Sequence, residues 1–139
     1  MEGSLGFVFK IAVSVCGASA YYLFGGWSAL LGVLLTFVIV DYISGVVASW
    51  HEGELSSKVG LLGITKKVFI FVMVAVAHLI DTALGTPSMF RAATGFFYMA
   101  NELLSIIENV GRIGLPVPEP LKRAVEILNS KGETGENEK

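Results

Sequence analysis

The chain is poor in charged residues and in cysteine. Only 16% of its 139 residues are charged, whereas an average globular domain has roughly 25%. With a net charge of −2 and no stripe of Lys and Arg, it lacks the features of a nucleic-acid-binding protein. The single Cys16 excludes an intramolecular disulfide, and paired cysteines at metal-binding spacing are missing.

Catalytic motifs are missing as well. The sequence contains neither HExxH nor GxSxG, and Ser14, Ser44 and Ser105 have no His and carboxylate at a recognisable spacing. We therefore expect no enzymatic activity and no cofactor or metal ion.

Apolar residues are what the chain has in excess. They make up 53% of the sequence, the mean hydropathy is +0.68, and they come in long runs. Because a helix needs about 20 mostly apolar residues to cross a membrane, these runs predict an all-α integral membrane protein. Its four transmembrane helices are expected at about residues 5–24, 27–50, 66–84 and 88–111.

The sequence after the expected crossings changes in character. A transmembrane helical domain of residues 1–112 is followed by a Pro-rich linker and a short amphipathic helix over residues 113–130, where apolar residues recur at helical spacing. Residues 131–139 are polar and contain glycine, which predicts a disordered tail.

The first apolar run has two competing interpretations. Lys10 interrupts it, and Ala18-Ser19-Ala20 imitates the cleavage site of a secretory signal peptide. The charge comes late for such a signal, however, and residues 21–24 continue the apolar run. A crossing whose Lys10 reaches the membrane interface is therefore the favoured interpretation.

Basic residues gather in two segments of the chain. Residues 112–131 form one, and the connection 51–67 forms the other and contributes Lys58, Lys66 and Lys67, which we expect at the membrane surface. The other two turns contain no Lys or Arg. The positive-inside rule places both basic segments in the cytoplasm, so an even number of helices should separate them. We therefore expect 88–111 to cross, with a cytoplasmic C-terminus.

The fourth expected helix has two faces. A row of polar or amphipathic residues follows helical spacing, formed by Arg91, Thr94, Tyr98, Asn101, Glu102, Ser105, Glu108 and Asn109. The opposite row is apolar. A charged group at mid-bilayer costs roughly 2.5–3.5 kcal/mol, so the polar row should meet other helices or water. The sequence leaves open whether this row lines a pore or is buried in an oligomer interface.

The second and third expected helices also carry polar positions. Asp41 is followed by Gly45 and Ser49 at helical spacing, which makes a small-residue face for close helix packing. His78 and Asp81 lie on one face of the third helix. We expect all five residues to take part in packing inside the membrane.

Four stretches of the sequence carry a resemblance to a known family. They are DYISGVVASW, GELSSKVGLLGITKKV, NELLSIIEN and PVPEPLKRAVEIL, in this order. Together they resemble the toxin-secretion/phage-lysis holin family of small phage membrane proteins. The resemblance implies a protein that oligomerises with itself in the bacterial cytoplasmic membrane and opens lesions that release an endolysin, or in some relatives a toxin. The family is often drawn with three crossings, and in that alternative residues 5–24 would not cross.

Two further functions fit the size of the chain. A small cation or multidrug transporter also has four helices, but it needs an acidic site, typically a Glu in the first helix, where this chain has Lys10 and no Glu. A structural partner subunit of a larger membrane complex is the other alternative.

Overall fold

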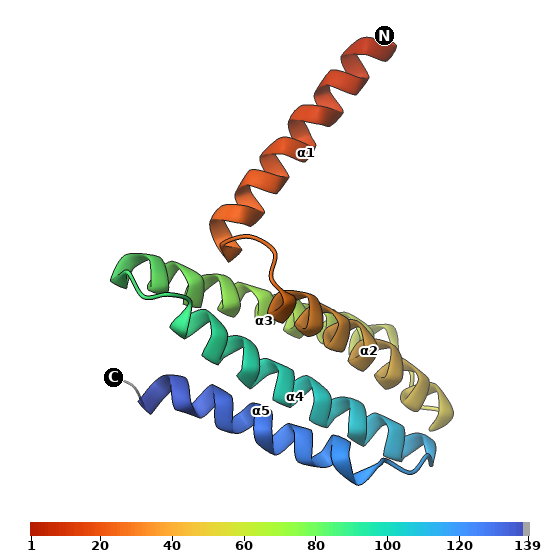
Figure 1. Cartoon of the computed structure of the whole chain (residues 1–139). Helices are drawn as coiled ribbons and strands as arrows, with labels where there is room; N and C mark the ends of the chain where they lie inside the picture. The colour runs from red at the N-terminus through yellow and green to blue at the C-terminus, as the bar shows by residue number, and fades with distance from the viewer. Residues whose placement is uncertain (138–139) are drawn as a thin grey trace.

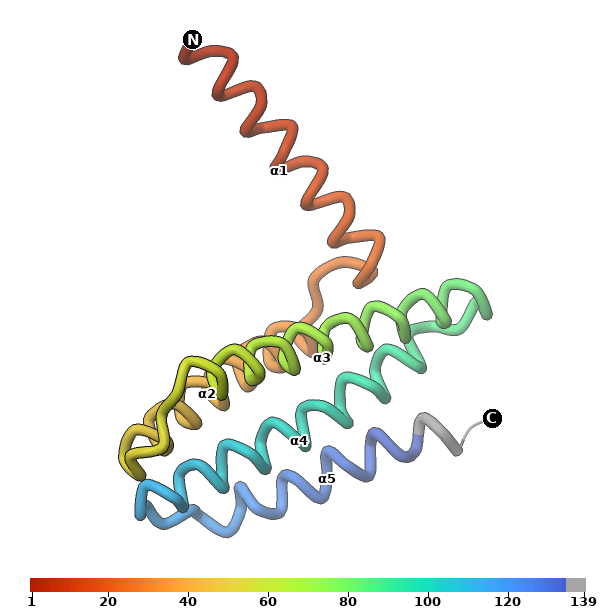
Figure 2. The backbone as a smooth tube through the Cα atoms, turned by 180° about the vertical axis from the view of Figure 1, so that it is seen from behind, coloured from red at the N-terminus to blue at the C-terminus, as the bar shows by residue number. Residues whose placement is uncertain are grey.

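The computed structural model describes residues 1–137, and every regular element in that part of the chain is an α-helix. The helices are α1 (Glu2–Phe24), α2 (Ala29–His51), α3 (Ser57–Leu84), α4 (Met89–Ile113) and α5 (Glu119–Asn137). Figure 1 shows α2, α3, α4 and α5 lying side by side, whereas α1 points away from them. The view from behind gives the same order, with α4 between α2 and α3 on one side and α5 on the other (Figure 2).

Three of these helices, α1, α2 and α3, are long and apolar enough to cross a membrane. The polar residues of α4 keep it out of this group, although the sequence predicted it as a fourth crossing. The all-α membrane class is thus supported by three crossing-competent helices within residues 1–137.

Capping residues decide where the helices begin and end. The side chain of Ser28 accepts a hydrogen bond from the Leu31 amide at the start of α2, and Ser56 accepts one from Val59 at the start of α3. Because Ser56 caps the helix there, α3 starts nine residues before the predicted position 66. α1 ends at Phe24 and is followed by the capping residue Gly25, whose left-handed φ of 71° suits a residue without a Cβ.

α5 extends beyond the boundary predicted from the sequence. Residues 131–137, expected to begin a disordered tail, belong to α5, and residues 138–139 lie outside the described part of the chain. Two contacts with α4 explain the extension. The Lys131 ammonium lies 5.4 Å from the centre of the Phe96 ring, and Gly132 is buried against the α4 backbone.

The hydrophobic core lies where α2, α3 and α4 meet. Its buried members are Leu31, Leu34, Val38, Ile70, Val74 and Met99. The outward sides of α2 and α3 carry exposed large apolar side chains, as expected of surfaces that face lipid. α1 has no buried residue, and its end contacts α3 through the edge-to-face pair Phe24 and Phe71, whose ring centres are 6.5 Å apart.

Candidate functional site

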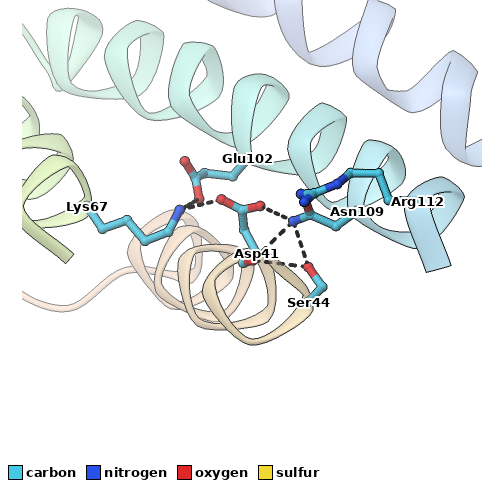
Figure 3. A network of polar contacts seen from close by, with 6 residues as sticks. All are labelled: Asp41, Ser44, Lys67, Glu102, Asn109 and Arg112. Carbon is cyan, nitrogen blue, oxygen red and sulfur yellow. Dashed lines mark hydrogen bonds and ion pairs between the residues drawn. The ribbon is translucent and has the colours of Figure 1, made fainter. Parts of the chain in front are cut away.

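A charged cluster lies at the interface of α2, α3 and α4 (Figure 3). Lys67 of α3 forms ion pairs with Asp41 of α2 and with Glu102 of α4, the latter at 2.7 Å. The side chains of both acids are 9% exposed and that of Lys67 is 16% exposed. One ammonium group therefore serves two nearly buried carboxylates, which joins the three helices through charge as well as through apolar packing.

Asn109 extends this cluster along α4. Its side-chain amide donates hydrogen bonds to Asp41 Oδ1 at 2.9 Å, to the Asp41 carbonyl at 3.2 Å and to Ser44 Oγ at 3.0 Å. The amide lies directly over Gly45, where an added Cβ would be 3.4 Å from Asn109 Nδ2. The small-residue face predicted around Asp41 is thus the place where α4 approaches α2 closely.

A second ion pair lies near the end of the cluster. Arg112 donates to both carboxylate oxygens of Glu52, from Nη2 at 2.6 Å and from Nε at 3.2 Å, and both side chains are about one-third exposed. Its hydrogen bonds hold the pKa of Glu52 below the ordinary value. Arg112 Nη1 also donates to Asn109 Oδ1 at 3.3 Å, which links this pair to the buried cluster.

The polar row predicted on α4 is divided between different surroundings. Glu102 and Asn109 are buried against the neighbouring helices, whereas Asn101 and Glu108 are exposed. Thr94, Tyr98 and Ser105 are half-buried between these extremes. On the surface of α4, Glu102 and Asn109 lie to one side of the line formed by the other polar residues. They therefore face α2 and α3.

A groove of about 450 Å³ opens beside the cluster. Asp41, Lys67 and Glu102 line it, together with the less buried polar residues Asn101, Ser105, Ser49 and Lys66. The ion cluster is therefore accessible from this side of the molecule through the groove.

Lys67 does not lie where the sequence predicted it. It was expected at the membrane surface with Lys58 and Lys66, but its ammonium lies between Asp41 and Glu102. Because α3 starts at Ser57, position 67 lies well inside the helix and faces α2 and α4. Lys58 and Lys66 are exposed, in keeping with a surface position.

Asp81 and His78, predicted to lie on one face of the third helix, have separate surroundings. Asp81 Oδ1 accepts hydrogen bonds from Thr86 Oγ1 at 2.5 Å and from the Phe90 amide at 2.9 Å, and Oδ2 accepts one from the Arg91 amide at 2.8 Å. Asp81 therefore caps the start of α4 from the preceding helix. His78 Nδ1 is buried and has no hydrogen-bond partner in the described part of the chain.

Arg91 also lies away from the other polar residues of α4. Its Nη1 donates to the carbonyl of Phe24 at 2.5 Å, at the C-terminal end of α1. A cation at this position compensates the free carbonyl groups and the partial negative charge of a helix end. Arg91 thus fixes the junction between α1 and the bundle and is separate from the cluster around Lys67.

The model of the bacteriophage holin family matches residues 18–130. The chain belongs to the bacteriophage holin family. The resemblance seen in the sequence is thereby confirmed, and membership supports a holin-like, non-enzymatic membrane protein.

Individual relatives of this holin-family chain come from bacteria and from a phage. A protein of Halalkalibacterium halodurans is 51% identical over 124 residues, which cover 86% of this chain and 92% of the relative. A Clostridium perfringens protein is 39% identical over 132 residues, with 94% and 99% covered. A protein of Bacillus phage phi105 named probable holin is 37% identical over 109 residues, with 78% and 80% covered. No solved structure matches.

Proposed function

We propose that this holin-family protein oligomerises in the bacterial cytoplasmic membrane and opens lesions through which an endolysin, or in a toxin-producing host a toxin, leaves the cytoplasm. The observation that carries the proposal is α4, a helix too polar for a lipid environment that is held along two apolar helices. Its exposed Asn101 and Glu108 then need a neighbouring copy or water as their surroundings. The phage relative named probable holin supports the same function.

The proposed topology has four crossings within α1 to α4, with α4 as the polar one. α4 runs beside α2 and α3 (Figure 1), so it occupies the depth at which they cross. Lys58 and Lys66 in the N-terminal part of α3, and Lys122 and Arg123 at the start of α5, favour a cytoplasmic location for these two segments, which agrees with two crossings between them. Lys58 and Lys66 then contact anionic headgroups, at about 1 kcal/mol each. α1 is the remaining crossing, which places the N-terminus in the cytoplasm.

A small cation transporter is the second candidate function. The observation in its favour is a pair of carboxylates, Asp41 and Glu102, beside a groove of about 450 Å³. Lys67 already neutralises one of these charges, which weakens the case for a cation site. A structural partner subunit is the third candidate, and no contact in the described chain favours it specifically.

Controlled expression in a bacterium separates the three functions. We expect growth to stop abruptly after a delay, together with a collapse of the membrane potential measured with a voltage-sensitive dye. A transporter would instead confer resistance to a toxic cation at constant potential, and a structural subunit would change neither reading. A sustained membrane potential at high levels of inserted protein would contradict lesion formation.

A further inference from the structure

α5 is attached to α4 along the side that faces away from α2 and α3 (Figure 2). The contact is close, because a Cβ on Gly132 would be 3.2 Å from the amide nitrogen of Phe97 and 3.3 Å from the carbonyl oxygen of Ala93. Leu128 of α5 also packs against the hydrophobic core cluster. α5 therefore returns along α4 from the linker after Gly114 towards the end where α4 begins.

The outward side of α5 is mainly polar. Its exposed polar residues are Glu119, Lys122, Arg123, Glu126, Ser130, Lys131, Glu133 and Thr134. Two large apolar side chains are exposed as well, Leu121 at 46% and Ile127 at 58%. Acidic and basic groups are mixed, so this surface has little net charge and does not resemble the basic face of a helix that binds anionic lipid.

The neighbouring helices determine the depth of α5 in the membrane. α2 and α3 are crossing-competent helices, α4 runs beside them, and α5 runs beside α4. If α2 and α3 cross the membrane, the outward side of α5 lies at the level of the lipid chains. Each charged group there would cost roughly 2.5–3.5 kcal/mol in contact with lipid. Lipid is therefore an unsuitable covering for this surface, whereas water satisfies its charges.

We propose that the outward face of α5 lines the water-filled opening of the lesion, with the α4–α5 pair towards water and the exposed apolar sides of α2 and α3 towards lipid. This inference rests on the proposed lesion-forming function. The mixed charges of the lining select against neither sign, which suits the passage of hydrated solutes and folded proteins. The C-terminal part of α5 then lies near the outer surface of the membrane, in contrast to the cytoplasmic C-terminus expected from loop charges alone.

Spin labels on the purified protein in lipid vesicles test this placement. In a Cys16→Ser background, labels at Thr82→Cys and Ser130→Cys report the distance between the outer end of α3 and the end of α5. We expect a short distance across the bundle, and a label at residue 130 that contacts a water-soluble nickel chelate. A label at Ile43→Cys, on the exposed apolar side of α2, serves as the control and should contact lipid-soluble oxygen instead.

Leakage of a dye trapped in the same vesicles tests the lesion-forming function, whereas the label distance tests the placement of α5. A distance of about 30 Å or more, the thickness of the hydrocarbon core, would place α5 in the cytoplasm and overturn the lining even if the dye leaks. A label at residue 130 that contacts oxygen and not the chelate would also overturn it. Absence of leakage at any distance would overturn the lesion-forming function on which the inference rests.

A matched pair of glycine variants tests the contact itself. Gly132→Leu places a side chain against the α4 backbone and should abolish dye leakage while the protein still inserts. Gly111→Leu adds the same side chain at an α4 position with no atom within 4 Å and should leave leakage unchanged. Leakage by Gly132→Leu at the rate of Gly111→Leu would overturn a lining that depends on docked α5.

Discussion

Lys67→Met is expected to destabilise the helix bundle more than any other single substitution considered. It leaves Asp41 and Glu102 beside each other, each 9% exposed and without its shared cation. Removing one partner of a buried ion pair typically costs about 3–5 kcal/mol. We expect this loss as a lower midpoint of thermal unfolding in detergent micelles, accompanied by loss of membrane depolarisation in cells.

Two comparison variants separate charge from packing at this position. Lys66→Met changes the neighbouring exposed lysine and should leave the unfolding midpoint nearly unchanged. The triple variant Asp41→Asn, Lys67→Met, Glu102→Gln removes all three charges at similar volume and should recover much of the stability. If Lys67→Met were as stable as Lys66→Met, the ion cluster would not hold the helices together. A triple variant as unstable as Lys67→Met would show that repulsion between the carboxylates is not the cause.

The second large effect is expected at Asn109, in comparison with Asn101 on the same helix. Asn109→Leu removes the donors to Asp41 and Ser44 in a buried position. An unsatisfied buried polar group costs about 1–3 kcal/mol, so the free energy of unfolding should fall by about that amount. The methyl groups that replace the amide would also lie against Gly45.

Asn101→Leu is the matched control for stability and a test of function. Asn101 is exposed and lines the groove, so the substitution should change the free energy of unfolding by less than about 0.5 kcal/mol. Its polar surface is nevertheless expected to meet water or another copy, and its loss should shift the time at which lysis begins. Equal unfolding of the two variants would contradict the division of the polar row into a buried and an exposed part.

The helices could be predicted from the sequence because their signal is local. Long apolar runs indicate α1, α2 and α3, and the two-faced pattern of residues 88–111 indicates a helix that needs partners. The family could be recognised from short stretches and is confirmed by the match over residues 18–130. These features depend on neighbours in the sequence, which a single chain displays directly.

The contacts of individual polar residues could not be predicted in the same way. Lys67 stands next to the exposed Lys66, but successive residues of a helix lie on different faces, and the packing of α3 places Lys67 against Asp41. Asp81 caps a helix that begins several residues later, because the turn after α3 brings the amides of Phe90 and Arg91 back to it. Both roles arise from packing between helices, for which the local pattern has no signal.

The structure of the tail after residue 130 could not be predicted from its local sequence either. Its polar composition is typical of disorder, but α5 continues to Asn137 because Lys131 and Gly132 contact α4. A glycine in a helix is usually unfavourable by about 0.5–1 kcal/mol. Here its small size permits the approach of two backbones, which no composition argument reveals.

Co-expression with an endolysin that lacks a signal peptide tests the central claim most directly. The endolysin alone should leave the culture intact, because its substrate lies outside the cytoplasmic membrane. With the holin-family protein present, the account predicts a delay followed by a sudden fall in culture turbidity as the endolysin reaches the cell wall. A culture whose turbidity stays constant, with endolysin activity retained in the cytoplasm and the protein fully inserted, would contradict the account.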